Sequence, residues 1–251
     1  MFAEIGLDVL LLLALAGFLG GFIDSIAGGG GLVTVPALLL AGLSPVEAIG
    51  TNKAQSVFGA ATASYAYASA GLVDVKRQLP SAALAFAGAI AGAALATVLP
   101  GDWLHTALPI LLVVIALYFA FKPDMGDVDR ARRIPPMLFG LTVVPTIGFY
   151  DGVFGPGAGS FLMLAFVALA GYGVLKATAH TRFLNFSSNL GSLIFFSAAG
   201  VVSWKIALVM GPAQIAGGRL GALLAMKNGA RLIKPLLVAT CVALAVRLLF
   251  G

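Results

Sequence analysis

Long apolar segments alternate with short polar stretches along the whole chain. Five such segments precede a charged stretch at residues 122–136, and five follow it. Several of them approach roughly 20 residues, the length of helix that crosses the hydrocarbon core of a bilayer. The pattern therefore predicts an all-α, polytopic membrane protein. The segments lie at residues 7–22, 32–43, 54–70, 81–99, 106–121, 137–149, 160–170, 183–199, 206–226 and 235–250.

Several motifs of the first half of the chain recur in the second half. The residues Phe-Ile-Asp at 22–24, followed by four glycines, are answered by Phe-Tyr-Asp at 149–151, followed by Gly-Pro-Gly. Further on, Lys53 matches Arg182 at a shift of 129 positions. A repeat of this length in an apolar chain is typical of transporters whose binding site lies where the halves meet. The sequence predicts repeat 1 at residues 1–121, a linker at 122–136 and repeat 2 at 137–251.

The first two segments of each half are shorter than a membrane span. Residues 32–43 would form about 18 Å of helix, against a hydrocarbon core of roughly 30 Å. Glycine-rich breaks, rather than charged loops, join the two segments of each pair. Non-helical backbone inside a membrane is tolerated only where it is buried in protein or lines a wet cavity. We therefore expect each pair to be short, broken or re-entrant, as a helical hairpin whose tip lies within the membrane.

The positive charges predict how the two repeats are oriented. Each half is expected to cross the membrane five times, or three times if its first pair of segments re-enters. Both numbers are odd, and an odd number of crossings inverts the second half relative to the first. In the first half Lys76 and Arg77 make the loop at residues 71–78 basic, whereas in the second half the basic loop is a different one, at residues 227–234. Because basic loops stay in the cytoplasm, we expect two inverted repeats, with the linker at 122–136 cytoplasmic and both termini outside.

The composition supports a membrane protein and argues against a soluble domain. The chain is 60% hydrophobic and only 10% charged, whereas soluble domains carry about 25% charged residues. Loop charges account for the net charge of +5, so we expect a lipid bilayer and no nucleic acid as partner. The single Cys241 provides no disulfide framework and no thiol cluster, so we expect no metal and no cofactor. The acidic N-terminal residues lack the positive start of a signal peptide, so the first segment is expected to be retained.

The glycine-rich breaks are candidates for anion binding. Each precedes a short helix, whose first N–H groups are unpaired and carry the positive end of the helix dipole. Two such helix ends meeting near the midplane would form a small anion site. The alternative is a hinge at which helices pack closely. The candidate glycines are Gly29, Gly30, Gly155 and Gly157.

A polar cluster follows the second segment of each half. Its equivalent cations are Lys53 and Arg182, each expected to open an apolar helix. An ionisable residue in or near a span is costly and often marks a functional site. The planar fork of Arg suits oxyanions and Lys adds a compact charge, although both cations could instead snorkel to the interface. The other candidate substrate-binding residues are Asn52, Gln55, Ser56, His180, Thr181, Asn185 and Asn189.

Two aspartates, Asp24 and Asp151, are also repeat equivalents, and each lies just before a glycine-rich break. They could carry protons for coupling, pair with Lys53 or Arg182, or cap the helix after the break. Their role is therefore either coupling or structural.

Two Gly-x-x-x-Gly motifs occur at equivalent positions of the repeats. Small residues four apart let two helices approach closely. We expect these motifs to pack helices, either inside the protomer or at the face of a homodimer. They consist of Gly88 and Gly92, and of Gly217 and Gly221.

The chain resembles the sulfite exporter TauE/SafE family of membrane transporters over essentially its whole length. Arg182 stands where the second half of this family usually has Lys, and His180 where it usually has Gly or Thr. The resemblance implies export of a small sulfur oxyanion or organosulfonate, such as sulfite or sulfoacetate, across the bacterial inner membrane. It rests on residues 21–31, Pro36, residues 48–53, residues 148–157, Asn185 and Asn189.

We expect a secondary transporter that moves a small anion by alternating access, and not an enzyme. A passive anion channel, or a transporter subunit for a different small anion, would use the same residues. An intramembrane protease is a remote alternative, because the sequence has no Gly-x-Gly-Asp motif and its two membrane aspartates are repeat equivalents.

Overall fold

The computed structural model describes residues 6–99, 128–229, 231–232 and 235. Within these residues every regular element is a helix, which confirms the predicted all-α class. The predicted segment 106–121 lies wholly, and 235–250 almost wholly, outside the described residues. The elements are α1 (Leu7–Ala27), α2 (Gly31–Leu40), α3 (Pro45–Ser69), α4 (Val75–Val98), α6 (Pro136–Leu138), the π-helix η1 (Phe139–Val143), α7 (Val144–Val153), α8 (Ala158–Ala168), α9 (Val174–Ala198) and α10 (Trp204–Asn228).

Four helical stretches are long and apolar enough to cross a bilayer, namely α1, α4, α10 and the run Pro136–Val153 formed by α6, η1 and α7. They confirm the prediction of a polytopic membrane protein. The helices α3 and α9 are each 25 residues long, but both carry buried polar side chains, including Lys53 and Arg182. The helices α2 and α8 have only 10 and 11 residues.

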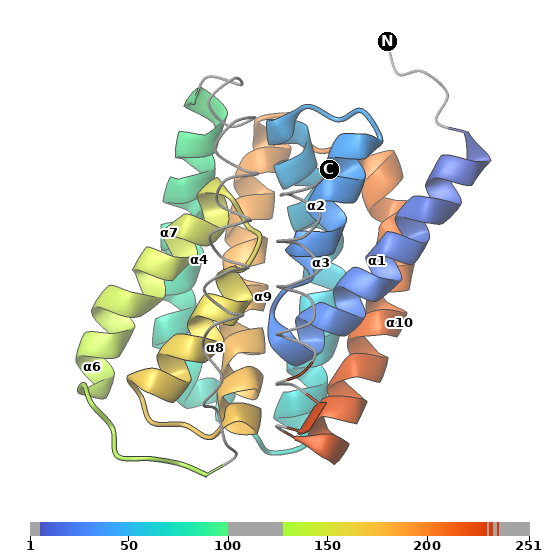
Figure 1. Ribbon diagram of the computed structural model, residues 1–251. Coiled ribbons are helices and arrows are strands. Elements are labelled where there is room, and N and C mark those ends of the chain that lie inside the picture. Colours follow the sequence, from blue (N-terminus) through green and yellow to red (C-terminus); the bar gives the residue numbers. More distant parts are fainter. Residues whose placement is uncertain (1–5, 100–127, 230, 233–234, 236–251) are drawn as a thin grey trace.

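The packing of the helices has the same pattern in both halves. The hairpin of α1 and α2 and the hairpin of α7 and α8 enter from opposite ends of the molecule, and α3 and α9 lie between them (Figure 1). The strongest contacts join α1 to α10 and α7 to α4, so the first helix of each half packs on a helix of the other half. In the same way, α3 of the first half packs on α10 of the second half, and α9 of the second half packs on α4 of the first half. The orientation of each half in a bilayer stays a prediction.

Glycines make the close helix contacts possible. A Cβ atom at Gly88 or Gly92 of α4 would overlap backbone atoms of α7, and one at Gly217 or Gly221 of α10 would overlap backbone atoms of α1. The structure thus places both Gly-x-x-x-Gly motifs at helix contacts inside the protomer.

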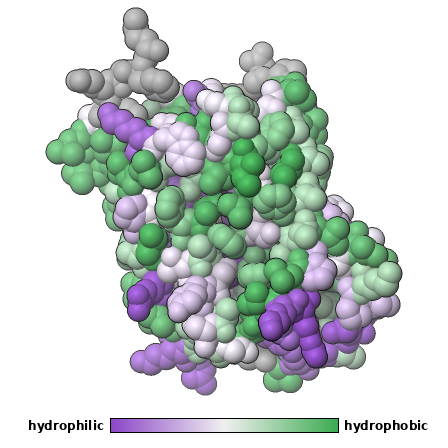
Figure 2. All heavy atoms as spheres, turned by 180° about the vertical axis from the view of Figure 1, so that it is seen from behind, coloured by the Kyte–Doolittle hydropathy of each residue, from purple (hydrophilic) through white to green (hydrophobic). Residues whose placement is uncertain are grey.

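The surface has the distribution of side chains that a bilayer requires. Apolar residues cover its middle, and hydrophilic residues gather mainly toward the lower end (Figure 2). Large apolar side chains remain exposed on the outer helices, such as Leu12 on α1 at 66% and Leu208 on α10 at 58%. Apolar exposure on this scale is favourable against lipid and unfavourable against water.

The helices α3 and α9 begin nine residues earlier than predicted, at Pro45 and Val174. The start of α3 is a capping box, in which the backbone N–H of Ser44 donates to Glu47 Oε2 at 3.0 Å, with proline in the first turn. Lys53 and Arg182 therefore lie about two turns inside their helices, and the prediction that they open apolar helices was wrong. The polar cluster interrupts the apolar pattern because it is the buried face of a helix, not a loop.

The first segment is also longer than predicted, because α1 continues to Ala27 and has 21 residues. The prediction that both leading segments are short was wrong for α1. Its polar last turn stays helical because its side chains have partners: Ser25 Oγ donates to the carbonyl of Phe22 at 2.8 Å, and Asp24 forms an ion pair with Arg182.

Candidate functional site

The tips of the two helical hairpins touch at the centre of the protein. The helix α1 ends at Ala27, and the next residue, Gly28, has a φ of 85°, a conformation that favours glycine. A Cβ atom at Gly28 would overlap the backbone of Gly159 and Ser160 in the other hairpin. Ser160 Oγ donates to the carbonyl of Ala27 at 2.8 Å, which links the two tips directly. The halves therefore meet at the two glycine-rich breaks.

One buried ion pair lies beside the tips, between Lys53 of α3 and Asp151 of α7. Lys53 Nζ is 2.6 Å from Asp151 Oδ1, and the side chains are only 1% and 3% exposed. The other carboxylate oxygen accepts hydrogen bonds from Ser188 Oγ at 2.5 Å and from Asn185 Nδ2 at 3.5 Å. Both oxygens of Asp151 are therefore satisfied, as a buried carboxylate requires.

A second ion pair joins Arg182 of α9 to Asp24 of α1. Arg182 Nη1 is 2.7 Å from Asp24 Oδ2, and the arginine side chain is 1% exposed whereas that of the aspartate is 18% exposed. Among the described residues, the other oxygen of Asp24 accepts one hydrogen bond, a long one of 3.3 Å from the N–H of Gly30.

Arg182 is held less completely than Asp151. Its Nε and Nη2 atoms are buried and have no hydrogen-bond partner among the described residues. These two donors form the side of the guanidinium that binds an oxyanion with two parallel hydrogen bonds. Nη2 lies beside the backbone of Gly28 and Gly159 at the hairpin tips. The site thus contains an unoccupied pair of donors of the kind that recognises oxyanions.

Both ion pairs connect the two halves of the chain. Each aspartate pairs with the cation of the other repeat, Asp24 with Arg182 and Asp151 with Lys53. The pairing that the sequence left as one of three possible roles is therefore present at both positions. The four formal charges cancel, so this arrangement carries no net charge.

A small polar cavity lies between the tips and the ion pairs. Its volume of about 20 Å³ is room for about one water molecule. A sulfur oxyanion is larger than water, so the cavity would have to widen to hold one. The cavity is lined by Asp24, Gly28, Gly31, Asn52, Lys53, Ser56, Asp151, Gly155, Gly157, Gly159, Asn185 and Asn189.

Most of the predicted site residues lie at or next to this cavity. Gln55 does not line it but donates through Nε2 to Asn52 Oδ1 at 2.8 Å, and Gly29 and Gly30 belong to the first hairpin tip. Arg182 lies directly behind the cavity wall, next to Gly28 and Gly159.

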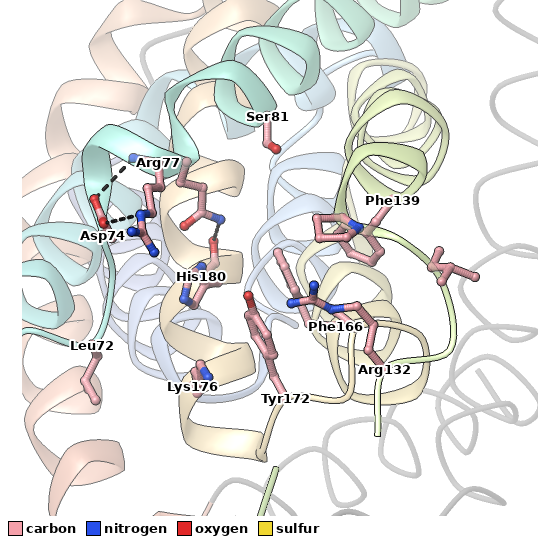
Figure 3. Close-up of a pocket in the computed structure, with 14 residues that line it drawn as sticks. Leu72, Asp74, Arg77, Ser81, Arg132, Phe139, Phe166, Tyr172, Lys176 and His180 are labelled. Atoms are coloured by element: carbon pink, nitrogen blue, oxygen red, sulfur yellow. Dashed lines mark hydrogen bonds and ion pairs between the residues drawn. The ribbon is translucent and has the colours of Figure 1, made fainter. Parts of the chain in front are cut away.

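His180 and Thr181 do not line the central cavity. His180 lies in a different cavity, where its ring is 5.0 Å from the ring of Tyr172 and 5.6 Å from that of Phe166 (Figure 3). Thr181 is fully buried. For His180 the reason is the helix period of 3.6 residues, which turns position 180 away from the face shared by Arg182, Asn185 and Asn189. Thr181 lies at the edge of that face, four residues before Asn185.

Two polar residues of the site were not predicted from the sequence. Ser188 donates to Asp151. The sequence feature that could have indicated it is its position three residues after Asn185, on the same helix face. Thr34 donates to Asn52 Oδ1 at 2.5 Å, and its signal was a single polar residue in the apolar helix α2. Within the described residues no group of three or more His, Cys, Asp or Glu side chains is arranged to hold a metal ion.

Comparison with known proteins gives a family for this chain. The family model described as sulfite exporter TauE/SafE matches residues 13–248. The chain is 56% identical to the probable membrane transporter protein ORF9 of Sinorhizobium sp., over 98% of this chain and 94% of that protein. It is 42% identical to the probable membrane transporter protein YfcA of Escherichia coli (strain K12), over 100% of this chain and 92% of that protein. No solved structure matches the chain.

Proposed function

The chain belongs to the sulfite exporter TauE/SafE family and is a bacterial membrane transporter, and from this premise we propose that it exports a small anion by alternating access. The family makes it a transporter rather than an enzyme. The cargo we propose is sulfite, sulfoacetate or another small sulfur oxyanion or organosulfonate.

The observation that carries this proposal is the pair of free donors on Arg182. A buried guanidinium with unsatisfied donors is costly unless a ligand or a conformational change satisfies them. Nε and Nη2 form one planar fork that suits an acceptor with two oxygens, and sulfite, sulfonate and sulfate all present such an edge. Asn52, Ser56, Asn185 and Asn189 would supply further polar groups around the adjacent central cavity, which Lys53 lines in its ion pair with Asp151.

The balanced charges suggest how the anion and the site interact. Two cations and two carboxylates leave no net charge to attract an anion. An anion that binds Arg182 must therefore compete with Asp24 or arrive together with a proton that neutralises it. This gives Asp24 a coupling role in addition to its structural one.

The hairpin tips supply the moving part. They touch through Gly28 and Ser160 and leave room for about one water molecule. Movement of one hairpin away from the other would open the cavity to one side of the membrane, while the opposed hairpin keeps it closed to the other. In the bacterial inner membrane, we place the linker at residues 122–136 in the cytoplasm and both termini outside.

Flux of labelled sulfite or sulfoacetate in proteoliposomes tests the proposal. We expect saturable transport in the wild type and its loss in Arg182→Gln. The matched control is Arg219→Gln on α10, because Arg219 lies outside both ion pairs and the central cavity. Equal transport by the wild type and Arg182→Gln, or currents typical of an open channel, would contradict the proposal.

A further inference from the structure

A second cavity, of about 590 Å³, lies apart from the central site. It is enclosed by the first turn of α4, the segment before α6, the π-helix η1, and the ends of α8 and α9 (Figure 3). It shares no lining residue with the central cavity. Its volume is in the range of sites for ligands much larger than sulfite.

The cavity has an excess of positive charge. Arg77 and Arg132 approach it from opposite sides, and Lys176 also lines it, below His180 in the view (Figure 3). Two carboxylates face these cations: Asp74 is 3.3 Å from Arg77 and Asp129 is 2.7 Å from Lys176.

Asp129 stays ionised, because the backbone N–H of Gly173 and the side chain of Lys176 hold the pKa of its carboxyl below the usual range. Arg132, by contrast, has no ion pair among the described residues. The cations therefore outnumber the carboxylates by one, and an anionic ligand would restore the balance.

A buried acceptor in the cavity wall has no donor. Gln78 is only 6% exposed, and its Nε2 donates to the carbonyl of His180 at 3.1 Å. Its Oε1 is buried and has no hydrogen-bond partner among the described residues. Leaving such an acceptor unpaired is costly, so a ligand of this cavity should offer a hydroxyl or amino donor besides its negative charge.

The remaining lining is apolar, and so is the adjacent outer surface. Phe139 and Phe166 lie with ring centroids 4.7 Å apart in the cavity wall. Beside the cavity, Leu79, Met137 and Leu138 expose 54%, 74% and 48% of their surface, which identifies a face in contact with lipid tails. The cavity thus lies where basic side chains meet the hydrocarbon boundary.

From these features we propose that this cavity binds an anionic glycerophospholipid with a hydroxyl in its headgroup, of the phosphatidylglycerol class. Arg77 and Arg132 bind the phosphate, Gln78 Oε1 accepts a hydrogen bond from the headgroup hydroxyl, and the apolar wall contacts the start of an acyl chain. Basic pockets between membrane helices on the cytoplasmic side commonly hold such headgroups. A lipid here would join α4 to the linker and to α9.

The test is a titration of the full chain in detergent with single lipids, followed by native mass spectrometry and thermal unfolding. We expect phosphatidylglycerol to bind more tightly than phosphatidylcholine and to raise the Tm. The double change of Arg77→Gln and Arg132→Gln should weaken binding about tenfold or more. Arg133→Gln is the matched control, because Arg133 neighbours Arg132 but does not line the cavity.

A second experiment separates the contribution of the phosphate charge to binding from that of the headgroup hydroxyl. Phosphatidic acid carries the phosphate without a glycerol hydroxyl in its headgroup, so the wild type should prefer phosphatidylglycerol, and Gln78→Leu should lose that preference. The Tm of Gln78→Leu in the absence of lipid measures separately the cost of losing its hydrogen bond to the carbonyl of His180. Equal binding of phosphatidylglycerol and phosphatidylcholine would overturn the proposal. So would tight binding of soluble glycerol 1-phosphate without any preference for the lipid, because the site would then take free anions.

Discussion

The two buried ion pairs occupy equivalent positions in the repeats, yet they are built differently. The Lys53/Asp151 pair is almost fully enclosed, and Ser188 and Asn185 satisfy the second oxygen of its carboxylate. The Arg182/Asp24 pair has a partly exposed carboxylate and two unpaired arginine donors.

From this difference we infer that the two pairs keep the same charges but have different roles. A pair that is enclosed and whose carboxylate is fully hydrogen-bonded is suited to holding two helices together. A pair with free donors and an accessible carboxylate can exchange its partners for an anion and a proton. We therefore assign the Lys53/Asp151 pair to holding the halves together and the Arg182/Asp24 pair to binding and coupling.

The largest expected effect is on stability, from breaking the enclosed pair. Asp151→Ala would leave the charge of Lys53 buried and unpaired, at a cost of about 3–5 kcal/mol. Thermal unfolding in detergent measures it as a lower Tm. The double change with Lys53→Met should recover much of the loss, because it removes the unpaired charge as well. A Tm equal to that of the wild type for Asp151→Ala would contradict the assigned role.

The corresponding change in the other pair should cost less. Asp24→Ala removes a carboxylate that is partly exposed and has fewer hydrogen bonds, so we expect a loss of about 1.5–3 kcal/mol. The same unfolding experiment measures the Tm of both variants, so their losses of stability can be compared directly. If Asp24→Ala lowered the Tm as much as Asp151→Ala, the two pairs would not differ as we describe.

Exchanging the type of cation should affect ligand binding more than stability. Arg182→Lys keeps the charge but loses the planar fork, so we expect an affinity for sulfoacetate about tenfold weaker, or about 1.4 kcal/mol. Isothermal titration of the purified protein measures the change, and Arg219→Lys is its matched control. Unchanged affinity in Arg182→Lys would show that the planar pair of arginine donors does not contribute to anion binding.

The smallest expected effect comes from the hydroxyl that supports Asp151. Ser188→Ala removes one hydrogen bond to a carboxylate that keeps Lys53 and Asn185, so stability should fall by about 1 kcal/mol with transport retained. A loss of transport at unchanged Tm would show instead that Ser188 acts on the anion.

The sequence predicted the members of the site better than their contacts. Lys53, Arg182, Asp24 and Asp151 are charged residues in an apolar chain, and their duplication separates them from ordinary loop charges. Which aspartate pairs with which cation depends on contacts between segments more than 90 residues apart, so no local pattern reveals it. The unequal exposure of the two pairs has the same origin in tertiary packing.

The start of α3 and the position of His180 show two further limits. Apolar periodicity placed the start of the helix after its buried polar face, although the capping box at Ser44 and Glu47 indicates the true start. His180 was grouped with Arg182 because the two are close in sequence. The helix turns about 100° per residue, so neighbours in sequence face different cavities.

The measurement that tests the division of roles most directly is the affinity of Asp24→Asn and Asp151→Asn for sulfoacetate, measured by isothermal titration. Both variants are compared at equal amounts of folded protein. The amide in Asp24→Asn no longer neutralises the charge of Arg182, so an anion that binds Arg182 has no carboxylate to displace. We predict that Asp24→Asn folds and binds sulfoacetate more tightly than the wild type, whereas any folded Asp151→Asn changes the affinity much less. Equal affinities of the two variants, or an unchanged affinity in Asp24→Asn, would contradict the account.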